Sequence, residues 1–109
     1  MKILVQFRLK AGVAVSSVPS KLFVREELWA WSRYRSDRVR ELYLTQHPGH
    51  IAVVAEYADA AAAERDMSSL PLMLAGVMEA EFLELHPFTN WELLFAENVK
   101  AALANTTGG

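Results

Sequence analysis

The sequence contains no cysteine. Disulfide bridges, cysteine nucleophiles, iron–sulfur clusters and cysteine-based zinc sites are therefore excluded. Long apolar runs are also missing, since no segment approaches the roughly 20 apolar residues that a membrane-spanning helix needs. The apolar run within Met1–Lys10 is too short for a secretion signal, and a small-residue cleavage site is lacking. We therefore expect a cytoplasmic protein with no membrane partner.

An excess of positive charge is missing as well. The formal net charge is −2 and the isoelectric point is near 5.9, so there is no electrostatic reason to expect nucleic acid as a partner. Five arginines do cluster, but acidic residues interleave with them: Arg25, Arg33, Arg35, Arg38 and Arg40 lie among Glu26, Glu27, Asp37 and Glu41. This pattern is typical of a solvated helix end.

Apolar residues are abundant for so short a chain. Of 109 residues 52% are hydrophobic, and the mean hydropathy is +0.11. A chain of this length forms one domain, and a small domain cannot hide so much apolar surface by itself. We therefore expect part of the apolar surface to lie at an interface between subunits.

Segments with the apolar pattern of a strand alternate with segments that have the pattern of a helix along residues 1–88. Period-two patterns and turn signals, including Pro48-Gly49, predict strands, whereas an N-cap-type residue such as Asp59 before an alanine run predicts a helix. The predicted strands are 3–9, 39–47, 50–57 and 78–86, and the predicted helices are 19–35 and 59–69. The order βαββαβ predicts a ferredoxin-like α+β fold, an antiparallel sheet with two helices on one face.

The other face of that sheet has no helix to cover it. Residues 51–55 are apolar on both sides of the predicted strand, which favours a second sheet across the open face. We therefore expect a homodimer that closes into an α+β barrel, or a higher homo-oligomer. We predict that residues 89–109 form a C-terminal tail, helical over about 90–104 and disordered over 105–109, and that Trp91 and Phe95 anchor it on the partner subunit.

The first predicted helix carries the candidate for chemistry. At helical spacing Phe23, Trp31 and other apolar residues form one broad arc, and Glu27 lies near its middle. A carboxyl group aimed between helix and sheet loses hydration, which raises its pKa toward the range where it both accepts and donates a proton. The alternative is that Glu27 reaches the helix edge and pairs with a cation such as Arg8.

Histidines and tyrosines are the secondary candidates. His50 and Tyr43 are candidates for assisting catalysis, whereas Phe23, Trp31 and His86 are candidates for contacting a substrate. His47, His50 and His86 lack the HxH and HExxH spacings of metal sites, and no GxSxG, P-loop or GxGxxG motif occurs. We therefore expect no metal site and no nucleotide-binding site.

Three stretches resemble the muconolactone delta-isomerase family of the dimeric α+β barrel superfamily. They are the first strand Met1-Lys2-Ile3-Leu4-Val5-Gln6-Phe7, the helix segment Phe23-Val24-Arg25-Glu26-Glu27, and the elbow Ser68-Ser69-Leu70-Pro71-Leu72 followed by His86-Pro87. The resemblance covers roughly residues 1–88. It implies an oligomeric, cofactor-free isomerase in which Glu27 is the general acid and base that shifts a lactone double bond.

The sequence departs from the family at positions that bear on the substrate. Basic residues of the family near the glutamate, and in its first two strands, are replaced by Val24, Leu28, Gln6 and Leu44. A site without these cations is poorly suited to a lactone that bears a carboxylate. The resemblance to the family therefore predicts the fold of this chain better than it predicts the substrate.

Three functions remain open on the sequence. The first is an isomerase of a lactone-like or other small apolar cyclic substrate, as in the catabolism of aromatic compounds. The second is a cofactor-free monooxygenase or polyketide cyclase that binds a flat aromatic substrate with Trp29, Trp31 and the tyrosines. The third is a non-catalytic dimeric binding protein in which Glu27 only forms a salt bridge.

Overall fold

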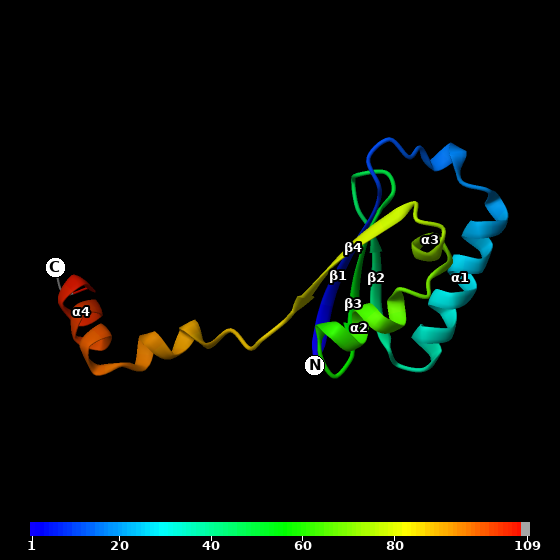
Figure 1. Cartoon of the computed structure of the whole chain (residues 1–109). Helices are drawn as coiled ribbons and strands as arrows, with labels where there is room; N and C mark the ends of the chain where they lie inside the picture. The colour runs from blue at the N-terminus through cyan, green and yellow to red at the C-terminus, as the bar shows by residue number, and fades with distance from the viewer. Residues whose placement is uncertain (108–109) are drawn as a thin grey trace.

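The computed structural model describes residues 1–107, with the backbone alone at 99, 100 and 105–107. A four-stranded sheet and the helices that pack on it form the body of the molecule, and a C-terminal segment projects from it (Figure 1). The elements in chain order are β1 (Lys2–Leu9), η1 (Val15–Ser17), α1 (Ser20–Arg35), β2 (Val39–Leu44), β3 (His50–Glu56), α2 (Ala60–Met67), α3 (Pro71–Leu74), β4 (Met78–Glu84), η2 (Thr89–Phe95) and α4 (Glu97–Thr107).

The sheet has the strand order β2-β3-β1-β4, and every neighbouring pair is antiparallel. In the central strand β1, Val5 pairs with Val53 of β3 on one side and with Phe82 of β4 on the other. Helices α1, α2 and α3 all lie on the same face of this sheet (Figure 1). The predicted ferredoxin-like α+β fold is therefore confirmed.

Alternation along the strands separates a covered face from an open face. Ile3, Val5 and Phe7 of β1 are buried under the helices, whereas Gln6 and Arg8 between and beyond them are exposed. The open face also carries apolar side chains, since register places Leu4 between Val54 and Leu83 there. Pairing of this open face with a second sheet stays a prediction.

The predicted boundaries hold within a few residues, except in the tail. Strand β2 stops at Leu44, before the predicted end at residue 47, because the tight connection through Pro48-Gly49 begins there. The helix predicted over 90–104 is broken at Ala96, whose extended backbone separates the 3₁₀ helix η2 from α4. Helix α4 continues to Thr107, and of the predicted disordered end 105–109 the last two residues lie outside the described part of the chain.

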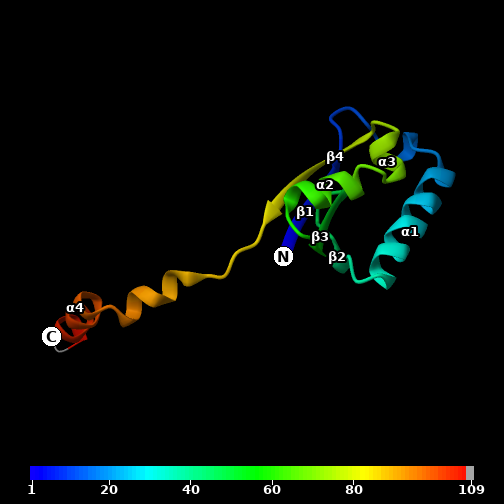
Figure 2. The same ribbon diagram turned by 60° about the horizontal axis from the view of Figure 1, so that its bottom comes forward.

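The tail extends away from the sheet and from α1 in both views (Figures 1 and 2). It gives the molecule a longest dimension of 65 Å against 29 and 20 Å in the other two directions. In residues 1–107 no helix is long and apolar enough to cross a membrane.

The start of α2 offers a test of local helix capping. The side chain of Asp59 accepts a hydrogen bond from the backbone N–H of Ala62 at 2.8 Å. Replacing Asp59 with alanine leaves this N–H without its partner, so we expect a loss of about 1 kcal/mol in the free energy of unfolding. Urea denaturation measures it, and Asp59→Asn should recover most of the loss because the amide oxygen also accepts.

Candidate functional site

A cavity of about 210 Å³ lies between α1 and the covered face of the sheet. Its walls are almost entirely apolar and come from all four strands and from α1, α2 and the α2–α3 connection. Helix α3 closes it with Leu72. The lining residues are Phe7, Phe23, Glu26, Glu27, Trp29, Ala30, Val39, Leu42, Tyr43, Leu44, Ile51, Val53, Met67, Leu70, Leu72 and Met78.

Glu26 brings a carboxyl group into this apolar space. It is only 7% exposed and is the one buried charged residue of the described chain. Its Oε1 accepts a long hydrogen bond of 3.5 Å from the backbone N–H of Leu72, and its Oε2 is buried with no hydrogen-bond partner. Buried carboxylate oxygens are normally satisfied, so this arrangement is a recognisable departure from ordinary core packing.

The surroundings of Glu26 change its acidity. Desolvation by burial raises its pKa from 4.5 to about 7, the hydrogen bond from Leu72 opposes this rise, and the nearby charge of Glu27 adds to it. Near neutral pH the group is therefore divided between acid and carboxylate. Such a group is suited to accept a proton and to return it.

The helix phase predicted from the sequence was wrong by one residue at this point. Glu26 rather than Glu27 occupies the buried position, and Glu27 lies at the exposed edge of the cavity. At 3.6 residues per turn, Leu22, Glu26 and Trp29 share the side that faces the sheet. The alternative, a salt bridge between Glu27 and Arg8, is not formed either, since Arg8 pairs with Glu79 at 2.7 Å on the open face.

The error has a physical cause, because α1 has two apolar sides. Val24 and Leu28 belong with Trp31 to the apolar arc that was predicted to face the core, yet these three residues are 57–63% exposed. One feature of the sequence favours the observed helix orientation: Leu22 and Trp29 lie on the same side of the helix as Glu26. The residue types alone do not show which of the two apolar sides of α1 packs on the sheet.

Two other predicted site residues do line the cavity. Phe23 contributes to the wall from α1, and Tyr43 contributes from the edge strand β2. Tyr43 is 54% exposed, and its hydroxyl group donates a hydrogen bond to Oε1 of Glu41 at 2.6 Å. It therefore lies at the mouth rather than beside the Glu26 carboxyl group.

The remaining predicted site residues lie outside the cavity. His50 precedes the cavity-lining Ile51 and so points to the open face, where it pairs in register with Arg8. The imidazole of His86 is 65% exposed just after β4, with its Nε2 atom 3.6 Å from Glu84. Trp31 lies on the outer side of α1.

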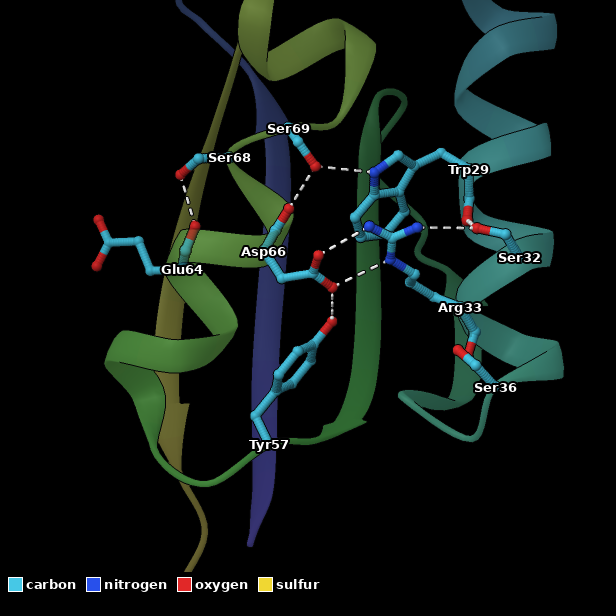
Figure 3. Close-up of polar contacts among 9 residues, drawn as sticks. All are labelled: Trp29, Ser32, Arg33, Ser36, Tyr57, Glu64, Asp66, Ser68 and Ser69. Carbon is cyan, nitrogen blue, oxygen red and sulfur yellow. Dashed lines mark hydrogen bonds and ion pairs between the residues drawn. The ribbon is translucent and has the colours of Figure 1, made fainter.

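A polar cluster holds α1 against α2 beside the cavity (Figure 3). Arg33 donates to both carboxylate oxygens of Asp66, at 2.8 and 3.1 Å, and the hydroxyl group of Tyr57 donates to Asp66 as well. The indole N–H of Trp29 donates to Ser69 Oγ at 3.0 Å, and the Arg33 guanidinium lies 4.2 Å from the Trp29 ring centre. These contacts join α1, the helix that carries Glu26, to α2 and to the residues that follow it.

The charged residues of the lining, and the side chains available as metal ligands, limit what the cavity can bind. Glu26 and Glu27 are the charged residues of its lining, and both are acids. Among the described residues, no group of three or more histidine, aspartate or glutamate side chains is arranged to hold a metal ion. The arrangement therefore favours a neutral, largely apolar guest in contact with one proton-exchanging carboxyl group.

Comparison with known proteins gives a structural likeness. No family model and no curated protein matches the sequence. Among solved structures, the chain is similar to a crystal structure of muconolactone isomerase, with a TM-score of 0.65 and 22% sequence identity over 83% of this chain and 95% of that one. At this identity the likeness shows that the chain has the α+β fold of muconolactone isomerase.

Proposed function

We propose that the protein is an acid–base isomerase that shifts a double bond in a small cyclic substrate, with Glu26 as the proton-transferring group. The observation that carries this proposal is the buried Oε2 atom of Glu26, which lacks a partner beside an apolar cavity. The pKa near 7 supports the same role, because a general base is most effective when its pKa is near the working pH.

The proposed reaction needs one carboxyl group and no net change in protonation. The Glu26 carboxylate removes a proton from a carbon next to a carbonyl group, and the electron pair moves into a conjugated enolate. The resulting carboxylic acid then returns the proton to the far carbon of the conjugated system. Substrate and product are isomers, and Glu26 ends as the carboxylate with which it began.

The cavity supports a particular class of substrate. An apolar cavity of roughly 150 Å³ is large enough to bind benzene, so a volume of about 210 Å³ has room for one small ring. A substrate carboxylate would meet two acidic residues and no cation in this lining. We therefore infer a neutral lactone or ketone, rather than a lactone that bears a carboxylate.

Turnover of a neutral β,γ-unsaturated butenolide tests the proposal. Conversion to the conjugated isomer is followed by ultraviolet absorbance, and deuterium uptake from D₂O is followed by NMR. We expect kcat/KM to rise with pH through about 7, because the carboxylate form of Glu26 is the base. Glu26→Gln should lower kcat by about 10²–10⁴-fold, the usual contribution of a general acid–base group.

Glu27→Gln is the matched variant, since Glu27 lies at the cavity edge on the same helix. We expect it to lose much less activity than Glu26→Gln. A larger loss in Glu27→Gln would contradict the assignment to Glu26, and the absence of isomerisation and deuterium uptake across neutral lactones and ketones would contradict the isomerase. Oxygen consumption with a flat aromatic substrate would instead favour a cofactor-free monooxygenase.

A further inference from the structure

The outer side of α1 carries an aromatic groove next to the cavity. Glu27, Ala30, Trp31, Tyr34 and Leu42 line a hollow of about 270 Å³, here called the outer groove. The rings of Trp31 and Tyr34 are stacked, with their centres 5.9 Å apart and their planes 23° from parallel. The two side chains are 57% and 49% exposed, so this aromatic surface is accessible to a ligand.

The outer groove adjoins the cavity that holds Glu26. Glu27, Ala30 and Leu42 line both hollows, so the two hollows meet at these three side chains. At the same edge of the sheet Leu44, which also lines the cavity, is 87% exposed. A ligand that is larger than the cavity can therefore extend from it into the outer groove.

The sizes and the chemistry of the two hollows differ in a complementary way. The cavity of about 210 Å³ has room for one small ring, so a bulky substituent on that ring has to lie outside it. Glu27 is the one charged residue among the described residues that line the outer groove, which disfavours an anionic substituent. Stacked aromatic side chains favour contact with a further aromatic ring, in offset or edge-on packing.

We propose that the outer groove is the second part of the substrate site and holds an aromatic substituent of the ring that enters the cavity. This inference rests on the proposed function, because it takes the reacting ring to lie beside Glu26. The substrate class is then a neutral lactone or ketone that carries an aryl group on a short linker. Trp31, expected from the sequence to contact a substrate, does so from the outer side of α1 and away from the reacting atoms.

Binding of two saturated lactones tests this inference without any reaction, because neither has a carbon–carbon double bond to move. One is γ-valerolactone, which carries a methyl group, and the other is γ-(2-phenylethyl)-γ-butyrolactone, which carries an aromatic group on the same ring carbon. An NMR titration gives Kd for each. We expect the phenylethyl lactone to bind the native protein on the order of tenfold more tightly.

Trp31→Ala should remove this preference. We expect the Kd of the phenylethyl lactone to rise on the order of tenfold in this variant, whereas the Kd of the methyl lactone should change less than about twofold. Trp31→Phe keeps an aromatic ring at this position and should retain most of the preference. A split between the two lactones is the readout that a merely structural role of Trp31 would not produce.

Leu28→Ala is the matched control. Leu28 is 63% exposed and, like Trp31, lies on the outer side of α1, but it lines neither hollow. We expect this variant to bind both lactones as the native protein does. Circular dichroism establishes that each variant remains folded, since Leu28 and Trp31 both lie outside the buried core.

Several outcomes would overturn the proposal. Equal affinities of the native protein for the two lactones, or no binding of either at millimolar concentration, would show that the outer groove does not hold the substituent. An equal loss of affinity for both lactones in Trp31→Ala would show that Trp31 acts on the shape of the cavity. Unchanged affinities in Trp31→Ala, together with a lower native mass, would show that a second copy of the chain fills the groove.

The result is distinguishable from that of the isomerase test. If the phenylethyl lactone binds as expected but unsaturated butenolides are not isomerised, the two-part binding site stands and the acid–base role of Glu26 falls. If a methyl-substituted butenolide is isomerised but the preference for the aryl group is absent, the isomerase stands and the outer groove has no part in it.

Discussion

Glu26→Gln is expected to make the protein more stable than the native chain above neutral pH, by about 3 kcal/mol, with the two proteins nearly equal below about pH 4.5. The reason is that folding raises the pKa of Glu26 from 4.5 to about 7. Between these two values the folded protein binds a proton that the unfolded chain has released. Stability of the native chain therefore falls as pH rises through this window, and glutamine, which does not titrate, removes that loss.

Urea denaturation at several pH values from 4 to 9 measures the effect, and Glu27→Gln is the comparison. Glu27 is exposed and makes only the smallest of the contributions to the Glu26 pKa, so its variant should follow the native curve closely. Parallel pH curves for Glu26→Gln and the native chain would show that the carboxyl group is hydrated in solution. The acid–base proposal would then lose its physical basis.

Asp66→Ala is expected to lower the free energy of unfolding by about 2–3 kcal/mol at neutral pH. Asp66 accepts charge-assisted hydrogen bonds from Arg33 and a further bond from the mostly buried Tyr57. The Arg33 and Asp66 side chains are 29% and 28% exposed, so solvent screens this pair only partly. Removing one partner leaves the other polar groups unsatisfied, which is the costly case.

The same pair gives a pH dependence of opposite sign to that of Glu26. The Arg33 hydrogen bonds hold the pKa of Asp66 below its ordinary value of 3.8, and the Tyr57 hydrogen bond adds to this effect. The stabilisation is therefore present above about pH 4 and is lost as pH falls through the lowered pKa. The difference between Asp66→Ala and the native chain should shrink in acid.

Glu79→Ala is the control for the Asp66 variant. It breaks the ion pair between Glu79 and Arg8, whose side chains are 44% and 56% exposed, so we expect almost no change in the free energy of unfolding. A loss in Asp66→Ala no greater than in Glu79→Ala would show that the cluster does not hold α1 against α2. Asp66→Asn should lie between the two, because its amide still accepts one hydrogen bond.

The sequence predicted the ferredoxin-like α+β fold of residues 1–88, with strand and helix boundaries correct to within a few residues. The signals that predict it are local: the alternation of apolar residues in strands, the Pro48-Gly49 turn and the Asp59 cap. Each involves only a few neighbouring residues, so each can be recognised in the sequence. The order of the elements then restricts the sheet topology, because crossovers between strands have a fixed hand. The apolar open face of the sheet was predicted from the same alternation in residues 51–55.

Only the tertiary structure decided which carboxyl group enters the core. Adjacent residues on a helix differ by about 100° in direction, so the choice between Glu26 and Glu27 depends on which apolar stripe packs on the sheet. That choice depends on distant contacts, namely Leu72 beside Glu26 and Asp66 on Arg33, which the pattern of apolar residues within α1 does not reveal. The apolar pattern of a helix indicates that a side of it is buried. Which of the two apolar sides of α1 packs on the sheet is decided by residues that are distant in the sequence.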